Sequence, residues 1–367
     1  MSDASSLALP VVDPELEARL VERLARVEEL LVGHCQGRTP YVSRAAAHLM
    51  AAGGKRFRPL LVLLAAETGT HPEAEEVHTA ACVVELTHVA SLYHDDVMDE
   101  AALRRGADTA NARWDNHVAI LTGDFLFGRS SELTADLGPD AVRIQAQTFT
   151  RLVEGQILET VEPGPGEDPL AHYLEVVAGK TGSLIATSAR YGAMFAGATP
   201  EVVEALRSYG EIVGSAFQLS DDILDIASES ATSGKTPGTD LREGVPTLPV
   251  LMAQASTDPA DARLLDLLGR PLTDDAEHAE ALDLLRKHPA MDEAKAYGRK
   301  IVTEVTPLQG FHPAEAYHQD YATLHPQSGY IIAFDLPKIA NLEKVFPDRY
   351  RSQPQLVGAA QARSAKH

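Results

Sequence analysis

Two groups of aspartates carry the clearest chemical signal in this sequence. Asp95 and Asp99 stand four residues apart in HVASLYHDDVMDEAALRRG, and Asp221 and Asp225 repeat that spacing in QLSDDILD. On a helix, residues four apart leave the same face with their Cβ atoms about 6 Å apart. Carboxylates at this spacing form a clamp for a divalent metal ion. Two such pairs in one chain require a joint explanation.

Each pair taken alone has a plainer explanation, which is the solvated acidic face of an exposed helix. The neighbouring residues weigh against that explanation, because Val97 and Met98 lie within the first group and apolar residues such as Leu219 and Ile223 surround the second. Carboxylates on helices that otherwise form a core must be paired or bind a metal ion.

Basic residues gather at several other points along the chain. GGKRFRP places Lys55, Arg56 and Arg58 after two glycines and at the start of a predicted helix, where a diphosphate binds well, although a solvated basic turn has the same pattern. His88 and Gln218, taken alone, fit polar core residues with satisfied hydrogen bonds. The other candidates, in GKTGS, in the Gly-rich SGKTPGTD loop and after the first acidic group, are Arg104, Arg105, Lys180, Thr181 and Lys235.

Helical spacing recurs along most of the chain. Asp13 followed by Pro14 predicts the start of a helix, which continues with leucines at helical spacing. Hardly any segment shows the alternation typical of a strand. We therefore predict an all-α bundle of long helices around a central cavity, with ligand sites built from inward-pointing side chains. The other predicted helical segments are 41–51, the run from Pro59, 73–100, 110–136, 139–160, 168–197 and 199–227.

Composition limits the possible partners and the compartment. The 367 residues include 32 basic and 53 acidic ones, and the net charge of −21 argues against a nucleic-acid partner. Two cysteines, Cys35 and Cys82, form neither a disulfide framework nor a zinc set, so a cytoplasmic protein is expected. No apolar run reaches membrane-spanning length, and MSDASSLALP has an acid where a signal peptide needs a base. Any membrane contact is expected to be peripheral at most.

In order and approximate spacing, GGKRFRP, HDDVMDEAALRRG, GKTGS, QLSDDILD and GKTPGTDL resemble the motifs of the trans-isoprenyl diphosphate synthases, the polyprenyl synthetase family, over about residues 15–300. The resemblance implies the isoprenoid synthase fold, usually as a homodimer, and the condensation of isopentenyl diphosphate with an allylic diphosphate. It also implies Mg²⁺, because departure of the diphosphate requires neutralisation of its growing charge. The implied metal ligands are Asp95, Asp99, Asp221 and Asp225.

The resemblance extends to the substrate-binding residues. Arg104 and Lys235 match residues that help to bind the allylic diphosphate. One departure is Val245, which stands where the family often has a lysine, so one diphosphate contact is in doubt. The residues that match the isopentenyl diphosphate site are Lys55, Arg58, His88 and Arg105. Those that match positions that stabilise the cation and orient the allylic diphosphate are Lys180, Thr181 and Gln218.

The resemblance also suggests the length of the product. Ala90 and Ser91 lie one helical turn before Asp95, where an aromatic side chain in the family acts as a floor that stops chain growth. Both residues are small. We therefore expect a polyprenyl product longer than C20, in the range of C30 to C50.

The end of the chain departs from this pattern. Residues of about 301–356, with HPAEAYHQDY, resemble the C-terminal part of a peptide methionine sulfoxide reductase of the A type. Neither cysteine has the Gly-Cys-Phe-Trp context of that family's nucleophile, so no reductase activity is expected. A rearranged gene explains the fusion, and poor order with exposed apolar surface is expected beyond about residue 300. The expected domains are a loose leader at 1–12, a prenyltransferase domain at 13–300 and a reductase-like fragment at 301–367.

Two other functions fit part of the sequence. A terpene cyclase shares the fold and the first acidic motif, but it has no need of GGKRFRP and normally replaces the second aspartate cluster with an Asn/Ser/Glu set. A non-catalytic partner or regulatory subunit of a prenyl synthase is the second alternative. The intact aspartates favour an enzyme over this alternative.

Overall fold

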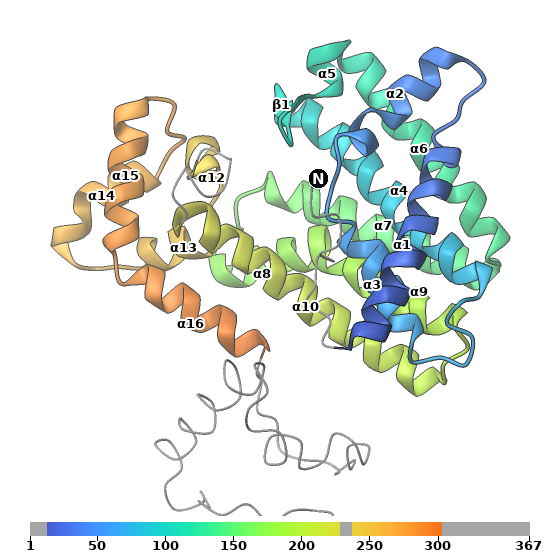
Figure 1. Cartoon of the computed structure of the whole chain (residues 1–367). Coiled ribbons are helices and arrows are strands. Elements are labelled where there is room, and N and C mark those ends of the chain that lie inside the picture. Colours follow the sequence, from blue (N-terminus) through green and yellow to red (C-terminus); the bar gives the residue numbers. More distant parts are fainter. Residues whose placement is uncertain (1–12, 228–236, 303–367) are drawn as a thin grey trace, which may run out of the picture. The chain divides into compact units, whose positions relative to one another are not determined.

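The computed structural model describes residues 13–227 and 237–302, shown in colour in Figure 1. The chain divides into two units, 1–304 and 305–367, and every described residue belongs to the first. The predictions for the leader, for Lys235 and for the reductase-like segment beyond residue 302 therefore lie outside the described residues.

The described part of the chain is almost entirely helical, which confirms the predicted all-α class. A π-helical turn, η1 (Ala178–Gly182), joins α8 to α9, and a short 3-10 helix, η2 (Pro259–Asp261), precedes α14. Strands β1 (Leu103–Arg104) and β2 (Ala107–Asp108) form a small antiparallel hairpin that the sequence analysis did not predict. The helices are α1 (Pro14–His34), α2 (Pro40–Ala51), α3 (Phe57–Ala66), α4 (Glu75–Met98), α5 (Ala110–Arg113), α6 (Asn116–Asp136), α7 (Pro139–Glu159), α8 (Pro169–Val177), α9 (Ser183–Phe195), α10 (Pro200–Ala227), α12 (Thr239–Glu243), α13 (Leu248–Gln254), α14 (Ala262–Leu268), α15 (Asp275–Lys287) and α16 (Ala290–Val302).

Local sequence signals set several of these boundaries. The Asp13 side chain accepts a hydrogen bond from the Glu15 N–H at 2.9 Å and caps α1, as predicted. The segment predicted as one helix at 110–136 is two helices, because the chain turns at Trp114 and Asp115 caps a new helix by accepting from the Val118 N–H at 2.9 Å. Asp, Asn, Ser and Thr are favoured at helix N-termini because their side chains can accept hydrogen bonds from backbone N–H groups in this way.

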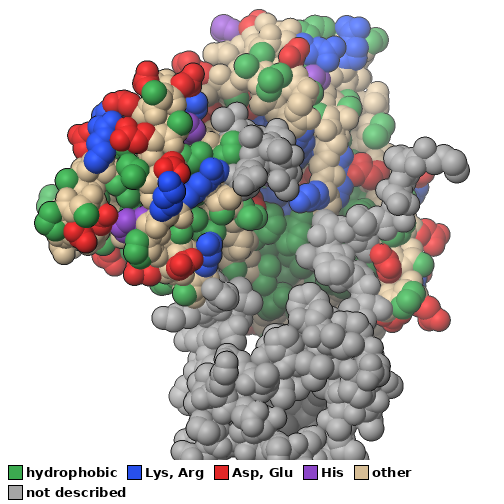
Figure 2. All heavy atoms as spheres, turned by 60° about the vertical axis from the view of Figure 1, so that its left-hand side comes forward, with side chains coloured by type: hydrophobic (Ala, Val, Ile, Leu, Met, Phe, Trp, Pro, Cys, Tyr) green, Lys and Arg blue, Asp and Glu red, His purple; other side chains and the backbone are tan. Residues whose placement is uncertain are grey.

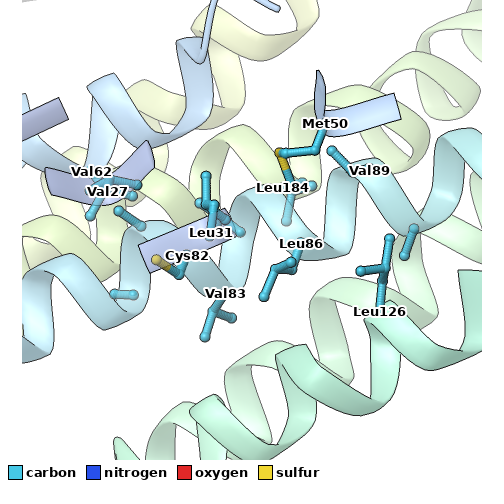
Figure 3. Packing of buried hydrophobic residues seen from close by; sticks show 14 of the residues in the cluster. Val27, Leu31, Met50, Val62, Cys82, Val83, Leu86, Val89, Leu126 and Leu184 are labelled. Carbon is cyan, nitrogen blue, oxygen red and sulfur yellow. The ribbon is translucent and has the colours of Figure 1, made fainter. Parts of the chain in front are cut away.

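The larger hydrophobic core surrounds α4. This helix packs against α1, α3, α6 and α9, and its side chains are buried on most of its circumference. Figure 3 shows the packing of Cys82, Val83, Leu86 and Val89 of α4 against side chains of the neighbouring helices, including Leu126 of α6. Because α4 is buried on nearly all sides, most polar side chains along its middle are buried with it. Its C-terminal end reaches the surface, so the residues there lie between core and solvent.

A second core is formed by the C-terminal half of α10 together with α8 and α12 to α16. Leu219 and Ile226 of α10 contact it, with Leu248 of α13, Leu267 of α14 and Leu285 of α15. On the face shown in Figure 2, acidic and basic side chains are interspersed, as expected from the Arg263–Glu280 and Arg270–Glu277 ion pairs. None of the helices in the described ranges is both long and apolar enough to cross a bilayer.

Candidate active site

The first acidic group lies at the C-terminal end of α4. Asp95 is half-buried, and Asp99 is the exposed C-cap residue, whose N–H donates to the Asp95 carbonyl oxygen at 2.8 Å. Burial raises the pKa of Asp95 to about 6, and the Asp99 carboxylate acts in the same direction while Lys180 opposes both. A carboxyl group with this pKa is partly protonated near neutral pH unless a further cation is bound beside it.

Lys180 reaches this group from the π-helical turn between α8 and α9. Its Nζ donates to Glu159 Oε2 at 2.6 Å, and the Glu159, Asp95 and Asp99 carboxylates together keep the Lys180 pKa raised despite burial. Close backbone packing makes this position possible, because a Cβ atom on Gly155 of α7 would lie 2.5 Å from the Lys180 backbone nitrogen. Only glycine permits that approach.

The second acidic group lies on α10 and continues into α12. Asp221 is exposed and Asp225 is half-buried, and the Asp240 N–H donates to Asp225 Oδ2 at 3.4 Å. Burial, followed by the Asp225 and Asp222 carboxylates, raises the pKa of Asp240 to about 7. Asp240 belongs to the GKTPGTDL motif, but the sequence analysis did not select it as a site residue.

Two glutamates link the acidic groups electrostatically. Partial desolvation, then the Asp99 and Glu159 carboxylates and more weakly Asp225, raise the pKa of Glu243. Glu159 also contributes to the raised pKa values of Asp95 and Asp240. Acids from α4, α7, α10 and α12 therefore act on one another across a common space.

This arrangement suits a divalent cation. Among residues 13–227 and 237–302, no three carboxylate, imidazole or thiol side chains already lie close enough together to hold a metal ion. Burial and, after it, repulsion between these carboxylates nevertheless raise several pKa values, and the donors are carboxylate oxygens, which Mg²⁺ and Ca²⁺ prefer. A bound cation would oppose both the burial and the repulsion that raise the pKa values of Asp95 and Asp240.

A chain of hydrogen bonds forms one wall of this region. The Thr181 hydroxyl donates to Gln218 Oε1 at 2.9 Å, Gln218 Nε2 donates to Asp222 Oδ1 at 2.9 Å, and the Tyr173 hydroxyl donates to Asp222 Oδ2. These four residues line a cavity of about 480 Å³ that Lys180 and Asp240 also line. The predicted residues Lys180, Thr181 and Gln218 are thus brought together.

Cationic side chains form a separate group around His88 of α4. Burial, with the guanidinium groups of Arg58, Arg105 and Arg104, holds the pKa of His88 well below its usual range. The imidazole is therefore neutral and retains one N–H donor. The buried Arg58 Nε has no hydrogen-bond partner in the described structure, while Lys55 is exposed in the preceding turn. Of the predicted isopentenyl diphosphate residues, Arg58, His88 and Arg105 lie together.

Two of the arginines are held by other parts of the chain. Arg104 Nε donates to the buried Asp96 Oδ1 at 2.5 Å, and an Arg105 N–H donates to the Gly53 carbonyl oxygen. Gly54, with φ of 151°, adopts a backbone conformation that favours glycine. Arg104 is also among the cations that lower the pKa of Asp95, so it lies between the acidic and the cationic groups.

A family model described as polyprenyl synthetase matches residues 39–285. The chain belongs to the polyprenyl synthetase family. It is therefore a prenyltransferase, and the motifs quoted above are those of a polyprenyl diphosphate synthase.

Relatives and solved structures agree with this assignment. The nonaprenyl diphosphate synthase of Mycobacterium tuberculosis is 54% identical over 272 residues, which are 74% of this chain and 81% of the relative. The heptaprenyl diphosphate synthase component 2 of Geobacillus stearothermophilus is 41% identical over 79% of this chain and 89% of its own. A geranylgeranyl pyrophosphate synthase from Corynebacterium glutamicum, complexed with calcium and isoprenyl diphosphate, has a TM-score of 0.71 at 48% identity over 80% of this synthase and 90% of that chain. The isoprenoid synthase fold is thus confirmed.

A second family model, peptide methionine sulfoxide reductase, matches residues 272–350. This confirms the resemblance of the C-terminal segment and extends it towards the N-terminus beyond the predicted boundary at about 301. Within that match, Leu282, Leu285 and Ala294 pack in the second core of the synthase.

Four functional candidates were missed by the sequence analysis: Glu159, Asp240, Glu243 and Tyr173. Glu159 is the last residue of α7 and Glu243 the last residue of the short α12, and neither belongs to an acidic pair at the four-residue spacing. Only Asp240 had a usable signal, since it lies in a motif already noted for Lys235. The two glutamates and Tyr173 became visible through packing of segments far apart in the sequence.

Proposed function

We propose that this prenyltransferase condenses isopentenyl diphosphate with an allylic diphosphate in an Mg²⁺-dependent reaction and releases a polyprenyl diphosphate longer than C20. The observation that carries the proposal is the mutual action of the α4 and α10 acids, through Glu243 and Glu159, beside Lys180. Incubation of the full chain with labelled isopentenyl diphosphate, farnesyl diphosphate and Mg²⁺ tests it. Absence of any extended product would contradict the proposal.

Different residues are proposed to act on different parts of the allylic substrate. Asp95, Asp99, Asp221 and Asp225 are the proposed metal ligands, and bound Mg²⁺ would supply neutralisation of the departing allylic diphosphate. Lys180 adds a positive charge to the same place, and Lys235 and Arg104 are proposed to contact the same diphosphate. The oxygen atoms of Thr181 and Gln218 are proposed to stabilise the allylic cation by their dipoles.

The second substrate must be bound without ionising. Arg58, His88, Arg105 and Lys55 are proposed to bind the diphosphate of isopentenyl diphosphate. The neutral imidazole and the arginines donate hydrogen bonds to its oxygen atoms, away from the acids that favour ionisation. This difference lets one site break a carbon–oxygen bond while the other only positions its ligand.

The requirement for Mg²⁺ should depend on pH. Metal ligands must be deprotonated, and burial raises the pKa of the proposed ligand Asp95 to about 6 and that of Asp240, beside the proposed ligand Asp225, to about 7. Protons therefore compete with the metal increasingly below pH 8. We expect the Mg²⁺ concentration for half-maximal activity to be roughly tenfold higher at pH 6 than at pH 8. Mg²⁺ titrations at both pH values check this, and equal midpoints would be inconsistent with the proposed ligands.

The product should shorten when Ala90 is replaced by Phe. Ala90 is fully buried on α4, and its carbonyl oxygen lies only 3.1 Å from where a Cβ atom on Gly123 of α6 would be. We expect the phenyl ring to extend into the path of an apolar chain that grows past Ser91 and to block it. We expect products of C20 or shorter, measured by chromatography of the dephosphorylated alcohols. Total isoprene incorporation serves as the control for folding. An unchanged length distribution at normal incorporation argues against the idea that the small side chains of Ala90 and Ser91 determine product length.

We also propose a cytoplasmic homodimer. Helices α6 and α7 pack side by side and expose large apolar side chains, namely Ile120, Leu121, Val142, Val153 and Ile157. Such a surface is typical of a subunit interface. Light scattering of the purified chain gives the mass, and a monomer at micromolar concentration would contradict the homodimer.

A partner subunit is the second candidate. One relative is named component 2 of a heptaprenyl diphosphate synthase, which favours an assembly of two different chains. The reductase-like segment, without its own nucleophilic cysteine, is proposed to have no reductase activity. In the labelled-substrate assay, activity of the isolated chain excludes an obligatory partner.

A further inference from the structure

A tyrosine outside every motif contacts the second acidic group. Tyr173 of α8 is buried, and its hydroxyl donates to Oδ2 of Asp222 on α10, a residue that is only 5% exposed. The other oxygen of Asp222 accepts from Gln218 Nε2 at 2.9 Å. Both carboxylate oxygens are therefore used within the protein.

The direction of these hydrogen bonds fixes the Gln218 amide. An ionised carboxylate only accepts hydrogen bonds, so Gln218 must turn its NH₂ group towards Asp222 and its Oε1 away from it. Oε1 then accepts from the Thr181 hydroxyl at 2.9 Å. Because the hydroxyl hydrogen points at Gln218, the lone pairs of the hydroxyl oxygen point in other directions. The orientation of two oxygen dipoles thus depends on the position of Asp222.

Tyr173 supplies the remaining support for Asp222. Its ring packs in the second core, and it lines the same cavity as Asp222, Gln218 and Thr181. Without the hydroxyl, Asp222 Oδ2 would face this cavity with no hydrogen-bond donor from residues 13–227 or 237–302, and the carboxylate would be free to turn towards water. A phenylalanine ring would still fill the core.

We propose that Tyr173 is a positioning residue of this prenyltransferase, which orients the Gln218 amide and the Thr181 hydroxyl through Asp222. The inference rests on the proposed function, in which Gln218 and Thr181 stabilise the allylic cation. It assigns Asp222 to hydrogen bonding within the protein, and it separates this residue from the proposed metal ligands Asp221 and Asp225.

The test compares two buried tyrosines. Tyr173→Phe should lower kcat about tenfold, the effect of losing one hydrogen bond to a charged group, while KM for isopentenyl diphosphate stays unchanged. Tyr191→Phe is the matched control, because Tyr191 is fully buried and its hydroxyl donates to the Ala141 carbonyl oxygen at 2.7 Å. It should lose similar thermal stability and keep the wild-type kcat.

A double-mutant cycle distinguishes positioning from general stability. If Tyr173 acts through Gln218, then Tyr173→Phe should cause no further loss of kcat in a Gln218→Ala background. A wild-type kcat for Tyr173→Phe, or losses that multiply in the double mutant, would overturn the inference. An inactive wild-type chain would instead count against the proposed function.

A second measurement does not need turnover. In protein labelled with ¹⁵N-glutamine, the side-chain NH₂ signal of Gln218, assigned by its absence in Gln218→Ala, should be protected from hydrogen exchange in the wild type and in Tyr191→Phe. It should exchange at least tenfold faster in Tyr173→Phe, because the acceptor Asp222 is no longer held. Equal exchange in all three proteins would also overturn the inference.

Discussion

Asp95→Asn should lower kcat by about a thousandfold, since a metal that neutralises a leaving group contributes several kcal/mol to transition-state stabilisation. Asp95 is half-buried, and both Lys180 and Asp99 influence the pKa of its carboxylate, so the carboxylate lies near both side chains. Asparagine keeps the size of the side chain and removes its charge. The measurement is steady-state kinetics at saturating substrate. It is repeated at Mg²⁺ concentrations that rise in roughly tenfold steps from limiting to saturating.

Glu100→Gln is the matched control for this experiment. Glu100 is an exposed acid directly after Asp99, with φ of 49°, and the substitution removes the same charge without touching the acidic group. Its kcat should remain within about twofold of the wild type, because screening by water makes an exposed charge a weak contributor. If Asp95→Asn retained a tenth or more of the activity, the proposed role of Asp95 as a metal ligand would have to be abandoned.

Arg56→Ala should cause the largest loss of stability, about 3–5 kcal/mol in the free energy of unfolding, which is typical when one partner of a buried ion pair is removed. Arg56 is buried and donates to Glu28 of α1, to Glu85 of α4 at 3.2 Å and to the Met50 carbonyl oxygen of α2 at 3.0 Å. Its removal leaves Glu85, which is 3% exposed, without its closest cation. Chemical denaturation measures the effect.

Lys55→Ala provides the contrast, because Lys55 is exposed and adjacent in sequence. Its free energy of unfolding should stay within about 0.5 kcal/mol of the wild type, as is usual for surface substitutions. The proposed effect of Lys55→Ala is a higher KM for isopentenyl diphosphate. If Arg56→Ala had the same denaturation midpoint as Lys55→Ala, the buried Arg56–Glu85 ion pair would not stabilise the fold.

The basic motif shows what sequence alone can predict. Three cations in four residues predicted a diphosphate site, but they did not reveal that the middle one is structural. That distinction depends on the left-handed backbone of Arg56, with φ of 47°, which turns its side chain towards the glutamates on α1 and α4. Local spacing cannot encode a pairing between residues separated by 28 and 29 positions.

The same limit applies to the acidic site. Helical spacing predicted that Asp95 and Asp99 share one end of a helix, because that relation is set within two turns. The contributions of Glu159 and Glu243 arise only when α7 and α12 are packed in place, so no short pattern contains them. The helix predicted at 110–136 failed for a local reason, since the capping preference of Asp115 outweighed the continuous helical spacing.

The second core limits where the junction of the proposed gene rearrangement can lie in this chain. Leu282, Leu285 and Ala294 close the second core, although they lie within the stretch that matches the reductase model. A recombination point upstream of α15 would have removed these side chains and opened the core beneath the second acidic group. A junction downstream of Ala294 would keep the hydrophobic contacts of α10 intact, so the proposed rearrangement would add the reductase-like sequence without loss of the synthase core.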